Sequence, residues 1–262
     1  MRFINLTSAL FILTLALSGC SKPDPNTLIV GTISGPETEL VDVAQKVALE
    51  RYGLTVKIIE FSDYNLPNEA LMDGTLDANV YQHLPYLEAA KAAHGYAFDV
   101  IGKTFLYPTG IYSAKIKSLK QLPDRALIAM PNDPSNESRA LLLLQKAGLI
   151  TLKTTRVMTI QDISHNPKNL RFKELDAAQL PRILADVDAA VINTTFAIPA
   201  GLRPTRDALF LENKHSPYAN LIVVRHGNEK QEQLALLVKA LNSNEVKEKA
   251  HALFGDAAIV AW

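Results

Sequence analysis

Segments with a strand pattern alternate with segments with a helix pattern along most of the chain, which restricts it to the α/β class. Residues 27–33 are apolar and β-branched, as in a buried strand. Residues 37–52 place apolar side chains three and four positions apart and are followed by Gly53, which predicts a capped helix with one apolar face. Residues 55–61 are the next predicted strand. This strand–helix–strand unit predicts a mainly parallel sheet with a right-handed crossover.

The alternation continues on both sides of one extended run. Residues 105–113 are interrupted by Pro108 and Gly110, and a proline in a strand indicates an edge or a bend. We interpret this run as a crossover between two lobes. The other predicted strands are 77–81, 126–130, 170–175, 189–193, 209–212 and 219–225. The other predicted helices are 67–72, 85–94, 134–147, 177–185, 229–241 and 245–254.

The expected fold is therefore two α/β lobes with a ligand cleft between them. We assign residues 27–109 and 223–262 to the first lobe and residues 110–222 to the second. The strand at 219–225 is expected to cross back to the first lobe. Strand ends in α/β folds face such a cleft, and ligands bind there.

The first twenty residues have the pattern of a lipoprotein export signal. Arg2 precedes the largely apolar stretch 3–17, and small residues lead to Cys20, the only cysteine. This run resembles the lipobox of bacterial lipoproteins, so we expect a signal peptide at 1–19, lipid on Cys20 and a short polar tether at 20–26. An uncleaved membrane helix is the alternative, but the apolar run is shorter than the ~20 residues that a span needs. A disulfide within the chain is excluded.

Composition and motifs argue against several classes of function. Loss of the signal leaves 243 residues with 26 basic and 27 acidic side chains, a net charge of −1, so no nucleic acid partner is indicated. The sequence contains no catalytic serine elbow, zinc-protease motif or phosphate loop. The six histidines show no metal-ligand spacing. We therefore expect neither an enzyme nor a cofactor or metal site.

Residues 131–139 form the segment with the most polar groups suited to a ligand. Asp133 can cap the predicted helix and Pro134 suits its first position, so free amides there favour an anion. Arg139 follows, and its guanidinium can bind a carboxylate through two parallel hydrogen bonds. Alternatively, Arg139 is a solvated helix residue or pairs with Glu137.

Two asparagines stand at or near the ends of apolar strands. Asn193 ends the strand 189–193, and Asn220 stands similarly in 219–225. Each side-chain oxygen could accept a hydrogen bond from an ammonium group, although both residues could instead form turns.

Aromatic side chains gather in two extended runs. Tyr81, His83, Phe105, Tyr107 and Tyr112 could enclose an apolar side chain, and a thioether gains from contact with rings. Core packing is the alternative for the rings, and a structural role is favoured for His83 over metal binding.

Many of these residues lie in blocks that are similar to one protein family. The blocks are GPE (35–37), FSDY (61–64), LPNEAL (66–71), LDANVYQH (76–83), TFLYP (104–108), PNDPSNESR (131–139), LLLLQK (141–146), NPKNL (166–170), QLPR (179–182), AVINTT (190–195) and SPYANLIV (216–223). In this order they resemble the NlpA/MetQ family of methionine-binding lipoproteins that serve ABC importers. The resemblance covers essentially the whole mature chain.

The resemblance implies a type II periplasmic-binding-protein fold and a role for each candidate residue. Arg139 would hold an α-carboxylate, and Asn193 and Asn220 the ammonium group. We also place Asn136 among the ligand-binding residues. The thioether chain would be surrounded by Tyr81, His83, Phe105 and Tyr107. The chain departs from the family pattern in the stretch 107–112 and at Phe196, where a tyrosine is frequent.

The expected function is capture of L-methionine and its delivery to an ABC permease and ATPase. The protein would be lipid-anchored through Cys20 on the extracytoplasmic or periplasmic side of a bacterial membrane. Another amino acid, D-methionine or a short methionine peptide is the alternative ligand. A surface lipoprotein with an envelope or adhesion role is the alternative of another class.

Overall fold

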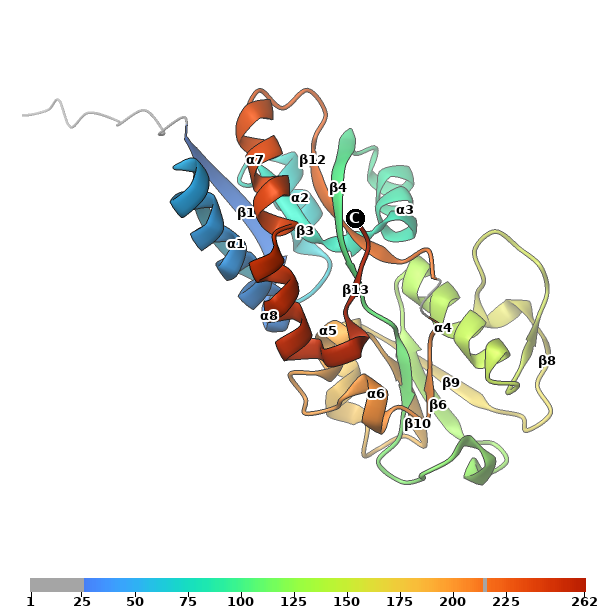
Figure 1. Cartoon of the computed structure of the whole chain (residues 1–262). Helices are drawn as coiled ribbons and strands as arrows, with labels where there is room; N and C mark the ends of the chain where they lie inside the picture. Colours follow the sequence, from blue (N-terminus) through green and yellow to red (C-terminus); the bar gives the residue numbers. More distant parts are fainter. Residues whose placement is uncertain (1–25, 214–215) are drawn as a thin grey trace, which may run out of the picture.

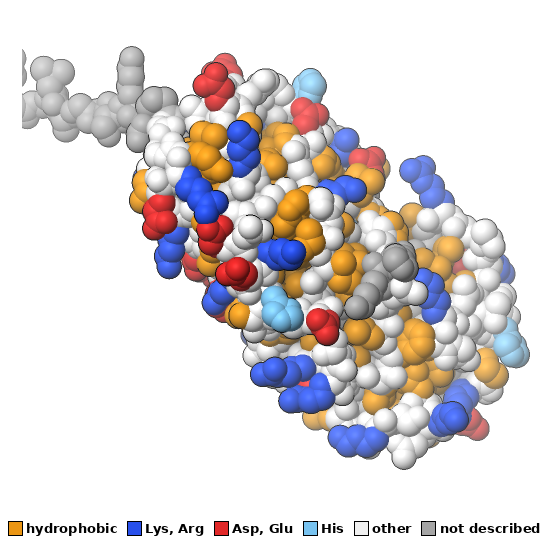
Figure 2. Space-filling model, in the orientation of Figure 1, with side chains coloured by type: hydrophobic (Ala, Val, Ile, Leu, Met, Phe, Trp, Pro, Cys, Tyr) orange, Lys and Arg blue, Asp and Glu red, His pale blue; other side chains and the backbone are white. Residues whose placement is uncertain are grey.

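The computed structural model describes residues 26–213 and 216–262 and contains two α/β lobes (Figure 1). The expected signal peptide, Cys20 and most of the tether lie outside the described residues. Among the described residues, no helix combines the length and the apolar character needed to cross a membrane. On the face shown in Figure 2, basic and acidic side chains are interspersed around apolar patches.

The first lobe is built on a six-stranded sheet in the order β13-β4-β12-β3-β1-β2. β1 pairs in parallel with β2 and β3, whereas β12 lies antiparallel between β3 and β4. The bounds are β1 (Thr27–Ile33), β2 (Thr55–Phe61), β3 (Ala78–His83), β4 (Phe98–Leu106), β12 (Ala219–Arg225) and β13 (Ile259–Val260).

Helices cover both faces of this sheet because its strands are apolar on both sides. On one face α1 packs on α7 and α8, and a core forms there around Leu28, Val30 and Ile222. A smaller apolar cluster that includes Leu71 and Leu87 brings α2 and α3 against the other face. The helices are α1 (Pro36–Tyr52), α2 (Leu66–Met72), α3 (Leu84–His94), α7 (Gln231–Leu241) and α8 (Asn244–Phe254).

The second lobe is built on a five-stranded sheet in the order β11-β5-β10-β6-β9. Its strands are β5 (Gly110–Tyr112), β6 (Leu127–Pro131), β9 (Arg171–Leu175), β10 (Ala189–Ile192) and β11 (Phe210–Leu211). Its helices are α4 (Pro134–Lys146), α5 (Thr194–Ala197), α6 (Pro204–Asp207) and 3₁₀ turns, and a hairpin of β7 (Thr151–Leu152) and β8 (Ile163–His165) lies beside α4. A core of Ile128, Leu141 and Val191 joins α4 to the sheet.

Two linking segments join the sheets and lie at the junction where the site forms. Residues 107–109 lead from β4 to β5, and the link from β11 to β12 starts at Glu212. The backbone N–H of Thr109 donates to the carboxylate of Glu212 at 3.2 Å, which ties the two links together.

The structure corrects two expectations of the sequence analysis. The sheets are mixed rather than mainly parallel, since four of the nine pairings in the two large sheets are parallel. The cause in the first lobe is β12, which returns from the second lobe and inserts antiparallel. The segment 177–185 is a 3₁₀-helix over Ala177–Ile183, because in an α-helix the ring of Pro181 would clash with the carbonyl four residues earlier.

The first half of β4, from Phe98, and the short strand β13 were not anticipated. The assignment of 27–109 and 223–262 to one lobe and 110–222 to the other stays a prediction. β12 pairs with the first sheet from Ala219 onward.

Candidate functional site

A cavity lies at the junction of the two lobes. Residues of both lobes line it, and seven of the eight predicted ligand residues are among them. The lining consists of Tyr64, Tyr81, Gln82, His83, Tyr86, Tyr107, Asn136, Arg139, Asn193, Thr194, Thr195 and Asn220. Most of these side chains are polar, and nearly all are buried.

Strand ends and helix starts position the polar side chains, as expected for an α/β fold. His83 ends β3 and caps α3, because its Nδ1 accepts from the N–H of Tyr86 at 3.2 Å. Asn193 follows β10 and precedes α5. Asp133 caps α4 by accepting from the N–H of Asn136 at 3.0 Å, which brings Asn136 and Arg139 into the first two turns of that helix.

Arg139 is buried and pairs with Glu212 rather than with Glu137 or solvent. Its Nε donates to Glu212 Oε1 at 3.1 Å, its Nη2 also bonds Glu212 Oε2, and Nη2 donates to the carbonyl of Tyr107 at 3.0 Å. The guanidinium carbon lies 4.2 Å from the centre of the Tyr218 ring. We expected the guanidinium to bind a ligand carboxylate through two parallel hydrogen bonds, but the edge formed by Nε and Nη2 binds the carboxylate of Glu212 instead. Nη1 makes none of these bonds.

Asn136 connects His83 of the first lobe with Asn193 of the second. The side-chain nitrogen of Asn193 donates to Asn136 Oδ1 at 2.9 Å, and His83 Nε2 lies 3.4 Å from the same oxygen. Burial lowers the pKa of His83 to about 3, so the ring is neutral at physiological pH. Since Nδ1 accepts from Tyr86, the ring proton is assigned to Nε2, which donates to Asn136.

These bonds determine which end of each asparagine amide is available to a ligand. The amide nitrogen of Asn193 is used by Asn136, and Asn193 Oδ1 has no hydrogen-bond partner among the described residues. The amide nitrogen of Asn220 donates to Glu37 Oε1 at 2.7 Å. Both asparagines therefore present an oxygen, a hydrogen-bond acceptor, for further contacts.

Aromatic rings form one side of the cavity. The rings of Tyr64, Tyr81 and Tyr86 are mutually in contact, with centroids about 6 Å apart. Phe196 of the second lobe packs on Tyr64 at 4.9 Å, so the position that departs from the family pattern lies at the lobe interface. Burial raises the pKa of Tyr64 and of Tyr81 well above the usual value, so both are neutral.

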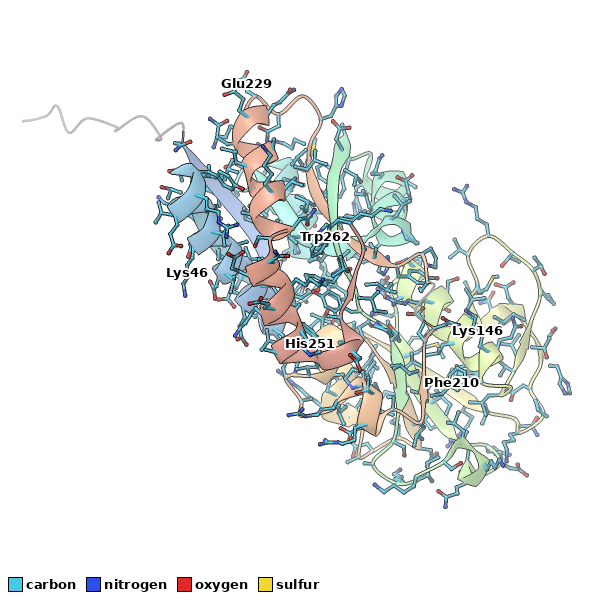
Figure 3. All side chains as sticks on the ribbon, viewed as in Figure 1. Lys46, Lys146, Phe210, Glu229, His251 and Trp262 are labelled. Atoms are coloured by element: carbon cyan, nitrogen blue, oxygen red, sulfur yellow. The ribbon has the colours of Figure 1, made fainter. Side chains whose placement is uncertain are left out.

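Phe105, the eighth predicted residue, does not line this cavity. It is buried in the core of the first lobe and packs at 4.9 Å on Trp262, which is labelled in Figure 3. It lines a neighbouring, mainly apolar cavity together with Glu37, and Tyr107 and Asn220 line both cavities. Tertiary packing, which a strand pattern does not reveal, places Phe105 there.

Sequence reasoning did not single out Glu37, Tyr64, Tyr86, Thr195 or Glu212. Glu37, Tyr64 and Thr195 lie within blocks that resemble the family, and that was the available signal. No sequence pattern indicated a role for Glu212, because its partner Arg139 is 73 residues away. Within the described ranges, no group of three or more His, Cys, Asp or Glu residues could hold a metal ion.

Two α/β lobes with a cavity lined mostly by polar side chains between them define the class of two-lobe ligand-binding proteins. The chain belongs to the NlpA lipoprotein family, whose model matches residues 28–262. This match confirms the resemblance inferred from the sequence blocks.

Known relatives agree in sequence and in structure. The D-methionine-binding lipoprotein MetQ of Salmonella typhi is 50% identical over 255 residues, which cover 95% of this chain and 94% of the relative. A periplasmic substrate-binding protein of an ABC transporter from Coxiella burnetii has a TM-score of 0.87 and 59% identity, over 89% of this chain and 100% of that one. A nutrient binding protein from Burkholderia cenocepacia, solved bound to methionine, has a TM-score of 0.88 and 52% identity, over 90% and 100% of the two chains. These similarities confirm the expected two-lobe binding fold.

Proposed function

We propose that this protein captures methionine in the cavity between its lobes and delivers it to an ABC importer. The observation that supports this most is that a buried arginine and two asparagine oxygens line one cavity together with tyrosine rings. These groups match the chemistry of a zwitterion with an apolar side chain. The names of the relatives, which state methionine binding and an ABC transporter, support the same ligand and partner.

The charged groups suit the two ends of an amino acid. Burying a carboxylate requires a paired charge, and Arg139 is the one cationic side chain among the cavity-lining residues. Because Glu212 and Tyr107 occupy its other donors, we assign the ligand carboxylate to Nη1. The oxygens of Asn193 and Asn220 would accept from the ammonium group.

Ligand binding would bridge the lobes. Asn220 belongs to a strand of the first sheet, whereas Arg139 and Asn193 belong to the second lobe. Direct bonds already join the lobes, such as Asn65 Nδ2 to Asp176 Oδ2 at 3.1 Å. A ligand held from both sides would add to such contacts and favour the closed form.

The enantiomer is a separate point. We propose L-methionine as the main ligand, while the curated relatives carry the name D-methionine-binding. D-methionine has the same three groups on the same carbon and is the second candidate. Titration with both enantiomers decides between them.

Calorimetry on protein freed of ligand by unfolding and refolding tests the proposal. We expect methionine to bind more tightly than glutamine, histidine or lysine. Asn193→Ala and Asn220→Ala should each weaken methionine binding by about 1–3 kcal/mol, because part of a desolvated cation loses its acceptor. The melting temperature of each empty variant is measured in parallel, because both side chains also donate to buried partners, Asn136 and Glu37, and a loss of stability has to be separated from the loss of binding. Preference for a charged side chain would rule out methionine, and negligible heats for every amino acid would favour a surface lipoprotein.

A further inference from the structure

Glu37 is a buried acidic residue beside the cavity to which no role has yet been given. It is the second residue of α1, after Pro36, and only 4% of it is exposed. Its Oε1 accepts from Asn220, and its Oε2 has no hydrogen-bond partner among the described residues. Leaving a buried polar atom without a partner is unfavourable, so such an atom points to a hydrogen-bond partner supplied by a ligand.

A second unpartnered oxygen belongs to the other lobe. Asn193 Oδ1 is also buried without a partner. Asn220 lines the main cavity and contacts Glu37 directly, and Thr195, which also lines that cavity, lies close enough to Glu37 to influence its pKa. Glu37 and Asn193 therefore carry unpartnered oxygens on the two lobes. Asn193 lines the main cavity, and Glu37 lines the adjoining cavity, which shares Tyr107 and Asn220 with the main one.

We propose that Glu37 is a third acceptor for the ammonium group of the ligand, beside the side-chain oxygens of Asn193 and Asn220. This inference rests on the proposed amino-acid ligand and adds a residue that selects for its free amine. An ammonium group has three N–H donors, and three acceptors would satisfy them all. A ligand without an amine would leave these acceptors unpaired, and a binding site discriminates strongly against such a loss.

Binding through Glu37 has a consequence for protons. Burial raises the pKa of Glu37 to about 8, while the nearby Thr195 hydroxyl and Asn220 amide lower it. The titratable groups that face it are Tyr64 and Tyr107, whose pKa values are also raised by burial, so both are neutral. The apolar residues of α1, α7 and α8 that line the adjoining cavity contribute no charge.

The proton balance is simple. In the empty site below about pH 8, Glu37 holds a proton. When the ammonium group enters, the carboxyl group releases this proton to solvent, and the ligand keeps all three of its own. Protons therefore compete with the ligand, so affinity should rise as the pH increases toward about 8 and then level off. The slope is at most about tenfold per pH unit for one proton.

Calorimetry at about pH 7 in buffers with different heats of ionisation measures the protons released per methionine bound. We expect close to one proton for the parent. Glu37→Gln should release almost none and should bind methionine at least roughly tenfold more weakly. The matched control is Glu137→Gln. Burial also raises the pKa of Glu137, but Glu137 accepts from the N–H of Ile160 at 3.1 Å and does not line the cavity. This variant should keep both the affinity and the proton release.

A second ligand separates the role of Glu37 from a general effect on folding. The methionine analogue in which hydrogen replaces the amino group should release no proton and should bind the parent and Glu37→Gln equally. Methionine binding by the parent without proton release, at an affinity independent of pH between about 6 and 8, would overturn the role of Glu37 and leave the proposed function intact. Absence of any methionine binding would instead contradict the proposed function itself.

Discussion

At the residue scale, the pair Arg139–Glu212 shows that one side chain can serve the fold and a ligand together. Both side chains are nearly fully buried, and Glu212 also accepts from Thr109 N–H and Ser216 Oγ at 3.2 and 3.1 Å. Arg139→Ala would leave Glu212 buried and without its counter-charge. We expect a loss of about 3–5 kcal/mol in the free energy of unfolding, measured by denaturant titration. Arg139→Ala combined with Glu212→Gln should recover part of this loss.

The effect of Arg139 on binding can be separated from its effect on stability with a matched ligand. Arg139→Lys should bind methionine more weakly, and Arg139→Ala more weakly still, by about 2–5 kcal/mol. Methionine amide lacks the carboxylate charge, so it should bind the parent poorly and lose far less in Arg139→Ala. Calorimetry of the four combinations of protein and ligand measures this. An equal loss for methionine and its amide would show that Arg139 does not contact the carboxylate.

At the element scale, β1 depends on a residue without a side chain. Gly31 pairs with Ile59 of β2 and Asn79 of β3, and an added Cβ would lie 2.4 Å from Leu76 Cδ1 and 3.1 Å from Phe61 Cε2. Leu76 is fully buried, so it has little room to move. Gly31→Ala should lower the free energy of unfolding by about 1–3 kcal/mol. In a Leu76→Ala background the same change should be nearly neutral. Additive losses would contradict the proposed clash.

At the scale of the whole molecule, the expected attachment point lies outside the described residues, seven positions before β1 begins at Thr27. The lipobox pattern predicts that Cys20→Ala abolishes incorporation of labelled fatty acid and removes the protein from the membrane fraction. Ser21→Ala, which keeps the thiol, should still be labelled. An alanine variant at position 20 that still incorporates fatty acid and sediments with membranes would disprove lipid attachment at Cys20.

Local patterns in the sequence were sufficient for the class of fold and for much of the site. Residue periodicity, caps and strand ends act over a few positions, so α1, α4, β1 and β6 were predicted within a residue or two of their bounds. The same patterns, with the family resemblance, selected seven residues that line one cavity, including Arg139 and Asn193.

Tertiary structure alone decided the features that depend on distant segments. The insertion of β12 between β3 and β4 made the first sheet mixed, although its local pattern is that of any buried strand. Arg139 pairs with Glu212, and Glu37 accepts a hydrogen bond from Asn220, which lies 183 residues away in the sequence. Phe105 lies in the core of the first lobe and does not line the main cavity. Local sequence preferences reflect neighbouring residues, whereas the partners of a buried charge or ring depend on how the whole chain packs.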